Sequence, residues 1–158
     1  MTAHHQFSPS QLAYREACPG WKPDEGPQSA QAAEGTMMHK ALETGDLKGL
    51  NEEQTRCVNL VSELFVSMRE ELEKGESKAE VHQEMRLGIM DLTFGTADLV
   101  VVSEAHAKIG DAKFGWNAVE DAETNLQGWA YAIGVFEKFP KVDYVEVVFA
   151  QQIGRAHV

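Results

Sequence analysis

The chain has 158 residues, of which 43% are hydrophobic and 25% are charged, and its net charge is −11 at pH 7. This length and composition indicate one soluble globular domain rather than a disordered chain. The acidic balance argues against a protein that coats nucleic acid through a basic surface, since that mode of binding needs many lysine or arginine contacts to phosphate. It does not exclude an enzyme acting on nucleic acid, because carboxylates that bind a metal ion themselves add negative charge.

Helices are predicted in the first half of the chain. Ser8 is a candidate cap for a short first helix, which the segment Cys18-Pro19-Gly20 ends, and a loop follows as far as Pro27. Two longer helices are predicted at residues 29–44 and 52–74. The second has the clearest periodicity of the chain, with an apolar stripe formed by Cys57, Val61, Leu64, Phe65, Met68 and Leu72.

The second half of the chain changes to the period of strands. Three consecutive strands are predicted at residues 80–87, 94–102 and 107–114, followed by a helix at 123–136 and a last strand at 142–150. This order predicts an α/β fold with a central mixed sheet flanked by helices. We expect one domain at residues 1–152. Residues 153–158 coincide, in one reading frame, with a common sequencing-library adapter, so we expect a non-native tail on a C-terminally truncated gene product.

Several protein classes lack support in the sequence. Cys18 and Cys57 form no Cys-x-x-Cys pair, so there is no zinc ribbon or obvious disulfide framework, and a reduced intracellular setting fits best. No apolar stretch approaches the roughly 20 residues that span a bilayer, and we expect no signal peptide. A nucleotide-binding switch is disfavoured because the chain has no Gly-x-x-x-x-Gly-Lys-Ser/Thr loop. A helical metal phosphohydrolase would need a His-Asp dipeptide, which is also missing.

Acidic residues on two predicted strands carry the strongest chemical signal. Asp98 leads into a strand too apolar to be exposed on both faces. Asp111 and Lys113, two residues apart on the next strand, should project from the same face. Two carboxylates on neighbouring strands can bind a hard divalent cation, and a lysine beside them can hold a phosphate or an attacking water. The pattern predicts a hydrolytic site.

A series of motifs in chain order resembles the PD-(D/E)XK nuclease superfamily, and within it the RecB-like branch of phage and prophage exonuclease-like proteins. The motifs are Ser8-Pro9-Ser10, Cys18-Pro19-Gly20, Ala33-Glu34-Gly35-Thr36 with His39, then Glu84, Gly95-Thr96-Ala97-Asp98, Asp111-Ala112-Lys113 and Asn125-Leu126-Gln127 with Tyr131. Any one of them is weak, because Asp-x-Lys occurs by chance in many proteins. Their common order, from about Phe7 to Ala150, carries the resemblance.

The resemblance implies a restriction-endonuclease-like core of order αβββαβ and a Mg²⁺- or Mn²⁺-dependent deoxyribonuclease, with exonuclease activity in phage DNA processing, recombination or repair. By this resemblance His39, Asp98, Asp111 and the backbone carbonyl of Ala112 would bind the metal, and Lys113 would be the catalytic lysine. The donor types agree, because Mg²⁺ and Mn²⁺ prefer oxygen ligands and an imidazole favours Mn²⁺. DNA would be the partner, together with a recombination or helicase protein, in the cytoplasm of a bacterial host.

Other residues have supporting roles in the same comparison. Gln127 and Tyr131, one turn apart, would support the site and touch the substrate strand, or they are plain packing residues. Glu43 and Glu84 would lie behind the metal ligands. Some RecB-like nucleases also hold an iron–sulfur cluster through one N-terminal and three C-terminal cysteines. Cys18 has only one other cysteine in this chain, so we expect no such cluster here.

Simpler interpretations stay open for each candidate. Asp111 and Lys113 could be a surface ion pair on an edge strand. His39 could pair with Glu43, one helical turn away. Glu84 could be solvated charge on a strand face that it shares with Glu80, His82 and Arg86. As a whole, the chain could also be a nucleic-acid-binding or assembly module that keeps the nuclease fold without turnover.

Overall fold

A computed structural model describes residues 7–23, 26–75, 78–115 and 118–151. Its elements are η1 (Pro9–Gln11), α1 (Leu12–Ala17), α2 (Ala30–Thr44), α3 (Glu52–Gly75), β1 (Glu80–Ile89), β2 (Thr93–Val102), β3 (His106–Lys113), α4 (Leu126–Lys138) and β4 (Tyr144–Gln151). The predicted elements are confirmed, with bounds that differ by a few residues. The expected tail at residues 153–158 lies outside the described residues, as does position 152.

The strands form one mixed sheet in the order β1-β2-β3-β4. Strands β1, β2 and β3 are antiparallel neighbours, whereas β3 and β4 pair in parallel. A parallel pair needs a crossover connection, and α4 lies in the connection between β3 and β4. The predicted mixed α/β fold flanked by helices is therefore confirmed, and the arrangement is compatible with a restriction-endonuclease-like core.

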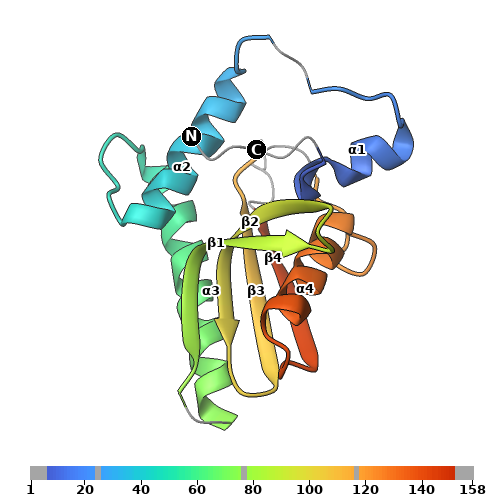
Figure 1. Ribbon diagram of the computed structural model, residues 1–158. Coiled ribbons are helices and arrows are strands. Elements are labelled where there is room, and N and C mark those ends of the chain that lie inside the picture. The colour runs from blue at the N-terminus through green and yellow to red at the C-terminus, as the bar shows by residue number, and fades with distance from the viewer. Residues whose placement is uncertain (1–6, 24–25, 76–77, 116–117, 152–158) are drawn as a thin grey trace.

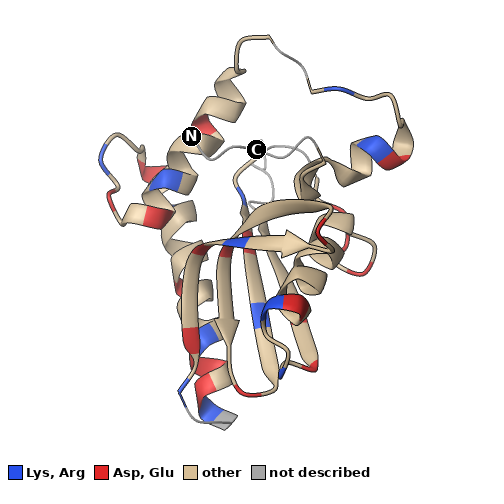
Figure 2. Cartoon of the chain, viewed as in Figure 1, with Lys and Arg blue, Asp and Glu red and all other residues tan. Residues whose placement is uncertain are grey.

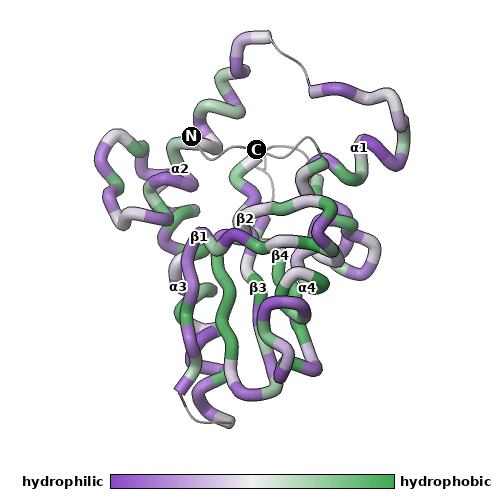
Figure 3. Tube along the Cα trace, viewed as in Figure 1, coloured by the Kyte–Doolittle hydropathy of each residue, from purple (hydrophilic) through white to green (hydrophobic). Residues whose placement is uncertain are grey.

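Helices cover both faces of the sheet (Figure 1). Helices α2 and α3 pack on one face, and α4 packs on the other. Each face of the sheet has its own hydrophobic core, one under α2 and α3 and one under α4. The apolar stripe of α3 predicted from the sequence packs into the core on the α3 side, and strand β2 contributes residues to both cores. Figure 3 shows β2 as a largely hydrophobic segment between the helices. The buried residues of the α3 side include Met38, Val58, Phe65, Met68, Leu99 and Val101, and those of the α4 side include Leu87, Val100, Ile109, Tyr131 and Val135.

Caps fix the helices that carry the candidate site residues. Helix α2, which carries His39, begins at Ser29, whose side chain accepts the N–H three residues further on, and ends at Gly45 with a left-handed φ of 71°. Helix α4, which carries Gln127, begins at Asn125, whose side chain accepts an N–H in the same way. The first residues of α4 are thus held in a fixed place beside the sheet.

The ladder between β1 and β2 is interrupted at one position. Glu84 and Asp98 form no backbone pair, although the residues on either side of them do, and Glu84 has a left-handed φ of 47°. This break makes the expected common face of Glu84 and His82 wrong. His82 lies beside the Phe139 ring at 5.7 Å, near the α4-side core, whereas Glu84 lines a pocket with Phe65 of α3. The alternation of a regular strand does not hold through such a distortion.

Candidate functional site

Asp111, Lys113 and Gln127 form a closed polar group between β3 and α4. The Lys113 ammonium lies 2.6 Å from Oδ2 of Asp111 and donates to Oε1 of Gln127 at 2.9 Å. The amide of Gln127 donates to Oδ1 of Asp111 at 3.1 Å. Asp111 and Lys113 therefore share a face of β3, as predicted. The surface ion pair is the wrong interpretation, because Asp111 is only 3% exposed.

Tyr131 connects this group to β2. Its hydroxyl accepts a hydrogen bond from the Gln127 amide at 3.1 Å and donates to the backbone carbonyl of Thr96 at 2.8 Å. Burial, and then the charge of Asp111, raise the pKa of Tyr131 above its ordinary value. The phenol therefore stays protonated at neutral pH and keeps its donated hydrogen bond. Tyr131 orients Gln127, which in turn orients Lys113.

Asp98 lies on β2 beside this group. Its side chain joins β2 to β3 just beyond their last backbone pair, which is Leu99 with Gly110. Its Oδ2 accepts the N–H of Ala112 on β3 at 2.6 Å, and its Oδ1 lies 3.7 Å from Nδ1 of His39. Burial, and then the charge of Asp111, raise the pKa of Asp98 to about 7, although the Ala112 hydrogen bond opposes this shift. Half-buried Asp98 and buried Asp111 thus repel each other when both are ionised.

His39 reaches the site from α2. Its ring meets the edge of Phe114 with centroids 5.0 Å apart, and Asp98 rather than Glu43 is the carboxylate beside it. Burial lowers the pKa of His39, with a smaller opposing effect from the charge of Asp111. A lowered pKa favours the neutral imidazole, which is the form that binds metal ions.

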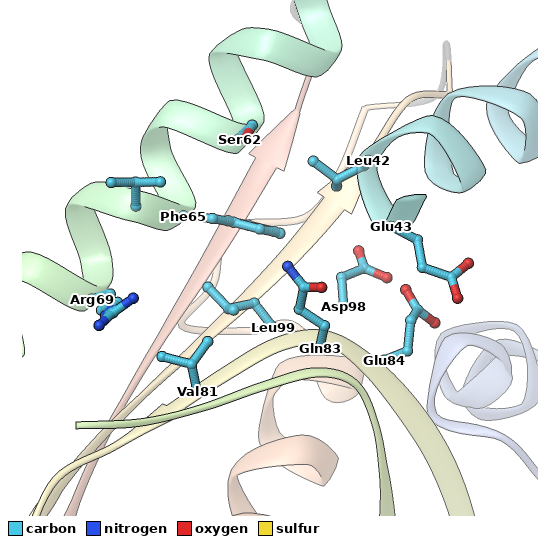
Figure 4. A pocket seen from close by; sticks show the side chains of 11 residues that line it. Leu42, Glu43, Ser62, Phe65, Arg69, Val81, Gln83, Glu84, Asp98 and Leu99 are labelled. Atoms are coloured by element: carbon cyan, nitrogen blue, oxygen red, sulfur yellow. The ribbon is translucent and has the colours of Figure 1, made fainter. Parts of the chain in front are cut away.

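A pocket of about 170 Å³ opens beside Asp98, between β1, β2, α2 and α3. Figure 4 shows the carboxylates of Glu43, Glu84 and Asp98 around one end of it, with Phe65 and Arg69 toward the other. Burial, and then the charges of Glu43 and Asp111, raise the pKa of Glu84. Glu43 and Glu84 therefore lie on the same pocket as Asp98.

Comparison with known proteins adds a family to this geometry. Residues 44–151 match the family model described as a protein of unknown function, DUF2800. The chain belongs to the DUF2800 family. No solved structure matches it. The match spans α3, the whole sheet and α4, and therefore includes Asp98, Asp111, Lys113, Gln127 and Tyr131, whereas His39 lies before its first residue.

The side chains of this DUF2800 protein fit a divalent cation in their donor types. Oδ2 of buried Asp111 accepts no hydrogen bond within the described residues, although the Lys113 ammonium is close to it. Burial, and then the charge of Asp111, raise the pKa of Asp98, and a divalent cation between the two acids would offset both effects. Among the described residues, however, no three His, Cys, Asp or Glu side chains already stand around one metal position. His39, Asp98 and Asp111 are the side chains that would hold such a cation.

Some features of the site were not foreseen from the sequence of this DUF2800 protein. The carbonyl of Thr96 holds Tyr131, and no sequence signal marks a backbone acceptor. Asn125 caps α4, and an asparagine before an apolar helical run is a recognisable signal for that role.

Within the described ranges, no helix has the length and apolarity to cross a membrane.

Proposed function

We propose that this DUF2800 protein is a metal-dependent deoxyribonuclease of the PD-(D/E)XK type. The observation that carries the proposal is the placement of Asp98 and Asp111 on neighbouring strands with the Lys113 ammonium 2.6 Å from one of the acids. Two carboxylates can hold a divalent cation, and an amine beside them can stabilise charge on a phosphate, so this combination can support hydrolysis of a phosphodiester. The order of motifs, which resembles RecB-like nucleases, supports the same function.

The residues would divide the work as follows. Asp98 and Asp111, helped by His39 and the Ala112 carbonyl, would hold Mg²⁺ or Mn²⁺, which when bound polarises a phosphate and lowers the pKa of a water. Lys113 would place its positive charge against the phosphate or orient the attacking water. Gln127 accepts a hydrogen bond from Lys113 and so fixes the direction of the ammonium group.

The resemblance further favours an exonuclease that acts in phage DNA processing, recombination or repair. DNA would then be its partner, beside a recombination or helicase protein, in the cytoplasm of a bacterial host. An exonuclease requires a free strand end, whereas an endonuclease does not.

An assay of linear, circular and end-blocked DNA tests both parts of the proposal. With Mg²⁺ or Mn²⁺ we expect degradation of linear DNA only, and none in the presence of a chelator. Cleavage of circular DNA would contradict the exonuclease activity but not the nuclease. Undiminished cleavage by Asp111→Asn would contradict the site itself.

A second candidate function is a nucleic-acid-binding or assembly module that keeps the fold without turnover. The observation that favours it is that no three potential side-chain ligands converge within the described residues. Figure 2 shows acidic and basic positions interspersed along the described ribbon. Mn²⁺ binding without any cleavage of linear DNA would support this function over the nuclease.

A further inference from the structure

We propose that the N-terminal segment of the described chain forms a platform for the unpaired bases of single-stranded DNA. The platform consists of Phe7, Tyr14, Arg15 and Trp21, and we call it the aromatic platform. This inference rests on the proposed function, because it names the form of DNA that the candidate nuclease site would receive.

The rings of the platform are already arranged for stacking. Tyr14 and Trp21 are stacked, with centroids 4.9 Å apart and an interplanar angle of 14°. The N–H of Trp21 donates to the carbonyl of Cys18 at 2.9 Å, so the Cys18-Pro19-Gly20 turn returns the indole to α1. Tyr14 is 52% exposed and Phe7 is 42% exposed. Both rings are therefore accessible to a ligand from solvent.

A cation lies within the same group of rings. The Arg15 guanidinium is 4.6 Å from the centroid of Phe7 and 5.8 Å from that of Trp21. Its Nε is buried and has no hydrogen-bond partner among the described residues, and no carboxylate there forms an ion pair with Arg15. Within the described residues this positive charge has no acidic partner, which is notable in a chain of net charge −11. A phosphate would supply both the missing charge and the missing acceptor.

These are the features by which proteins bind single strands. Unpaired bases stack on aromatic side chains, and arginine contributes stacking and contacts to the backbone. In a duplex the base faces are covered by their neighbours, so a stacking platform selects unpaired strands. The selection does not depend on sequence, because every base has a flat face.

The aromatic platform is joined to the candidate site through η1. Helix η1 follows Phe7 and packs against α4 and β2 (Figure 1). The packing is close, because a Cβ added at Gly95 would lie 2.7 Å from the Pro9 ring and 2.8 Å from the Tyr131 ring. Thr93 of β2 also donates to the carbonyl of Phe7 at 2.7 Å. A strand bound on the platform would therefore be held next to the residue that orients Gln127.

Binding of labelled oligonucleotides tests the inference. Fluorescence anisotropy would be measured with oligothymidine and with a duplex of the same length, in the presence of a chelator so that no cleavage occurs. We expect the single strand to bind more tightly than the duplex. Tyr14→Ala and Trp21→Ala should each weaken single-strand binding by about tenfold, whereas Tyr14→Phe, which keeps the ring, should bind as the unsubstituted protein does. Arg15→Gln should reduce the dependence of binding on salt.

The chain offers matched controls for both kinds of side chain. Tyr144 is 57% exposed and lies at the start of β4, opposite the start of β3 and so at the other end of that strand from Lys113. Tyr144→Ala therefore removes an equally exposed tyrosine away from the platform. Arg69 pairs with Glu73 on α3, and Arg69→Gln is the control for Arg15→Gln. Neither control should change single-strand binding.

The outcomes separate this inference from the nuclease proposal. If Tyr14→Ala and Tyr144→Ala bind the oligonucleotide equally well, or if no oligonucleotide binds, the platform serves another partner, such as a protein, and the inference is overturned. Equal affinity for single strand and duplex overturns it too. Lys113→Ala should still bind the single strand more tightly than the duplex, yet with Mg²⁺ or Mn²⁺ it should cut linear DNA far more slowly than the unsubstituted protein. Undiminished cutting by Lys113→Ala would overturn the nuclease proposal while leaving the preference for single strands unchanged.

Discussion

Strand β3 carries two lysines, and each forms an ion pair in a different setting. Nζ of Lys108 lies 2.5 Å from Oε2 of Glu71 on α3 and 3.2 Å from Oε2 of Glu146 on β4. The side chains of these two glutamates are 54% and 42% exposed. Lys113 lies on the opposite face, and its partner Asp111 has a side chain that is only 4% exposed. The first lysine thus links a helix to a strand at the surface, whereas the second faces a buried acid.

The two pairs differ in the burial of the acid and in the presence nearby of a second acid whose pKa is raised. The hydrogen bond from Lys108 is the main cause that lowers the pKa of Glu71, as expected for a satisfied surface pair. Beside Lys113, in contrast, Oδ2 of Asp111 accepts no hydrogen bond in the described part of the chain, and Asp98 has a pKa of about 7. Buried acids that perturb one another mark functional sites more often than isolated surface pairs do. Lys108 is therefore a natural control for every experiment on Lys113.

The largest expected effect is on catalysis. Lys113→Ala should lower metal-dependent cleavage of linear DNA by about 1,000-fold, because a positioned group that stabilises charge or moves a proton contributes on this scale. Lys108→Ala should cleave at close to the unsubstituted rate. Single-turnover rates on the same labelled substrate would measure both. Equal losses in the two variants would remove the distinction between the lysines.

The next effect is a dependence of stability on pH in the metal-free protein. Folded Asp98 binds its proton more tightly than the unfolded chain does, since its pKa rises from 3.8 to about 7. Its contribution to stability is therefore complete below about pH 4 and is lost as the pH rises through about 7. We expect the stability of Asp98→Asn relative to the unsubstituted protein to rise by roughly 4 kcal/mol between these limits. Urea unfolding in the presence of a chelator measures this difference, and a constant difference from pH 4 to pH 8 would contradict the shift.

A smaller effect on stability is expected from the packing around Tyr131, which orients Gln127 and through it Lys113. A Cβ at Gly95 would meet Pro9 and Tyr131 within 2.8 Å, whereas a Cβ at Gly88 would meet nothing within 4 Å. We expect Gly95→Ala to destabilise the fold by about 1–2 kcal/mol through overpacking, and to lower cleavage by displacing Tyr131. Gly88→Ala should do neither. Thermal unfolding and cleavage rates of the pair would show whether the close approach at Gly95 supports the site.

The smallest effect is expected at the surface pair. Lys108→Met keeps the length of the side chain and removes its charge, and pairs with exposed glutamates contribute little to stability. The loss of stability should be smaller than that of Gly95→Ala and should fade at high salt. A loss larger than that of Gly95→Ala would show that Lys108 holds the fold together more than its surroundings indicate.

Local patterns predicted most of this arrangement. The period of a strand placed Asp111 and Lys113 on one face, and the helical spacing placed Gln127 and Tyr131 one turn apart. The break at Glu84 could not be predicted, because it arises from pairing between two strands rather than from a local preference. The stacking of Trp21 on Tyr14, which the Cys18-Pro19-Gly20 turn makes possible, could not be predicted either. A turn signal marks a reversal of the chain but does not say which side chains the reversal brings together.

Titration with Mn²⁺ tests the central claim most directly, namely that Asp98 and Asp111 share a divalent cation beside Lys113. Calorimetry on the unsubstituted protein should show one Mn²⁺ site, which Asp111→Asn abolishes. Glu146→Gln, which removes an acid beside Lys108 instead, should retain it. Tight binding that survives in Asp111→Asn, or the loss of binding in Glu146→Gln alone, would contradict the account.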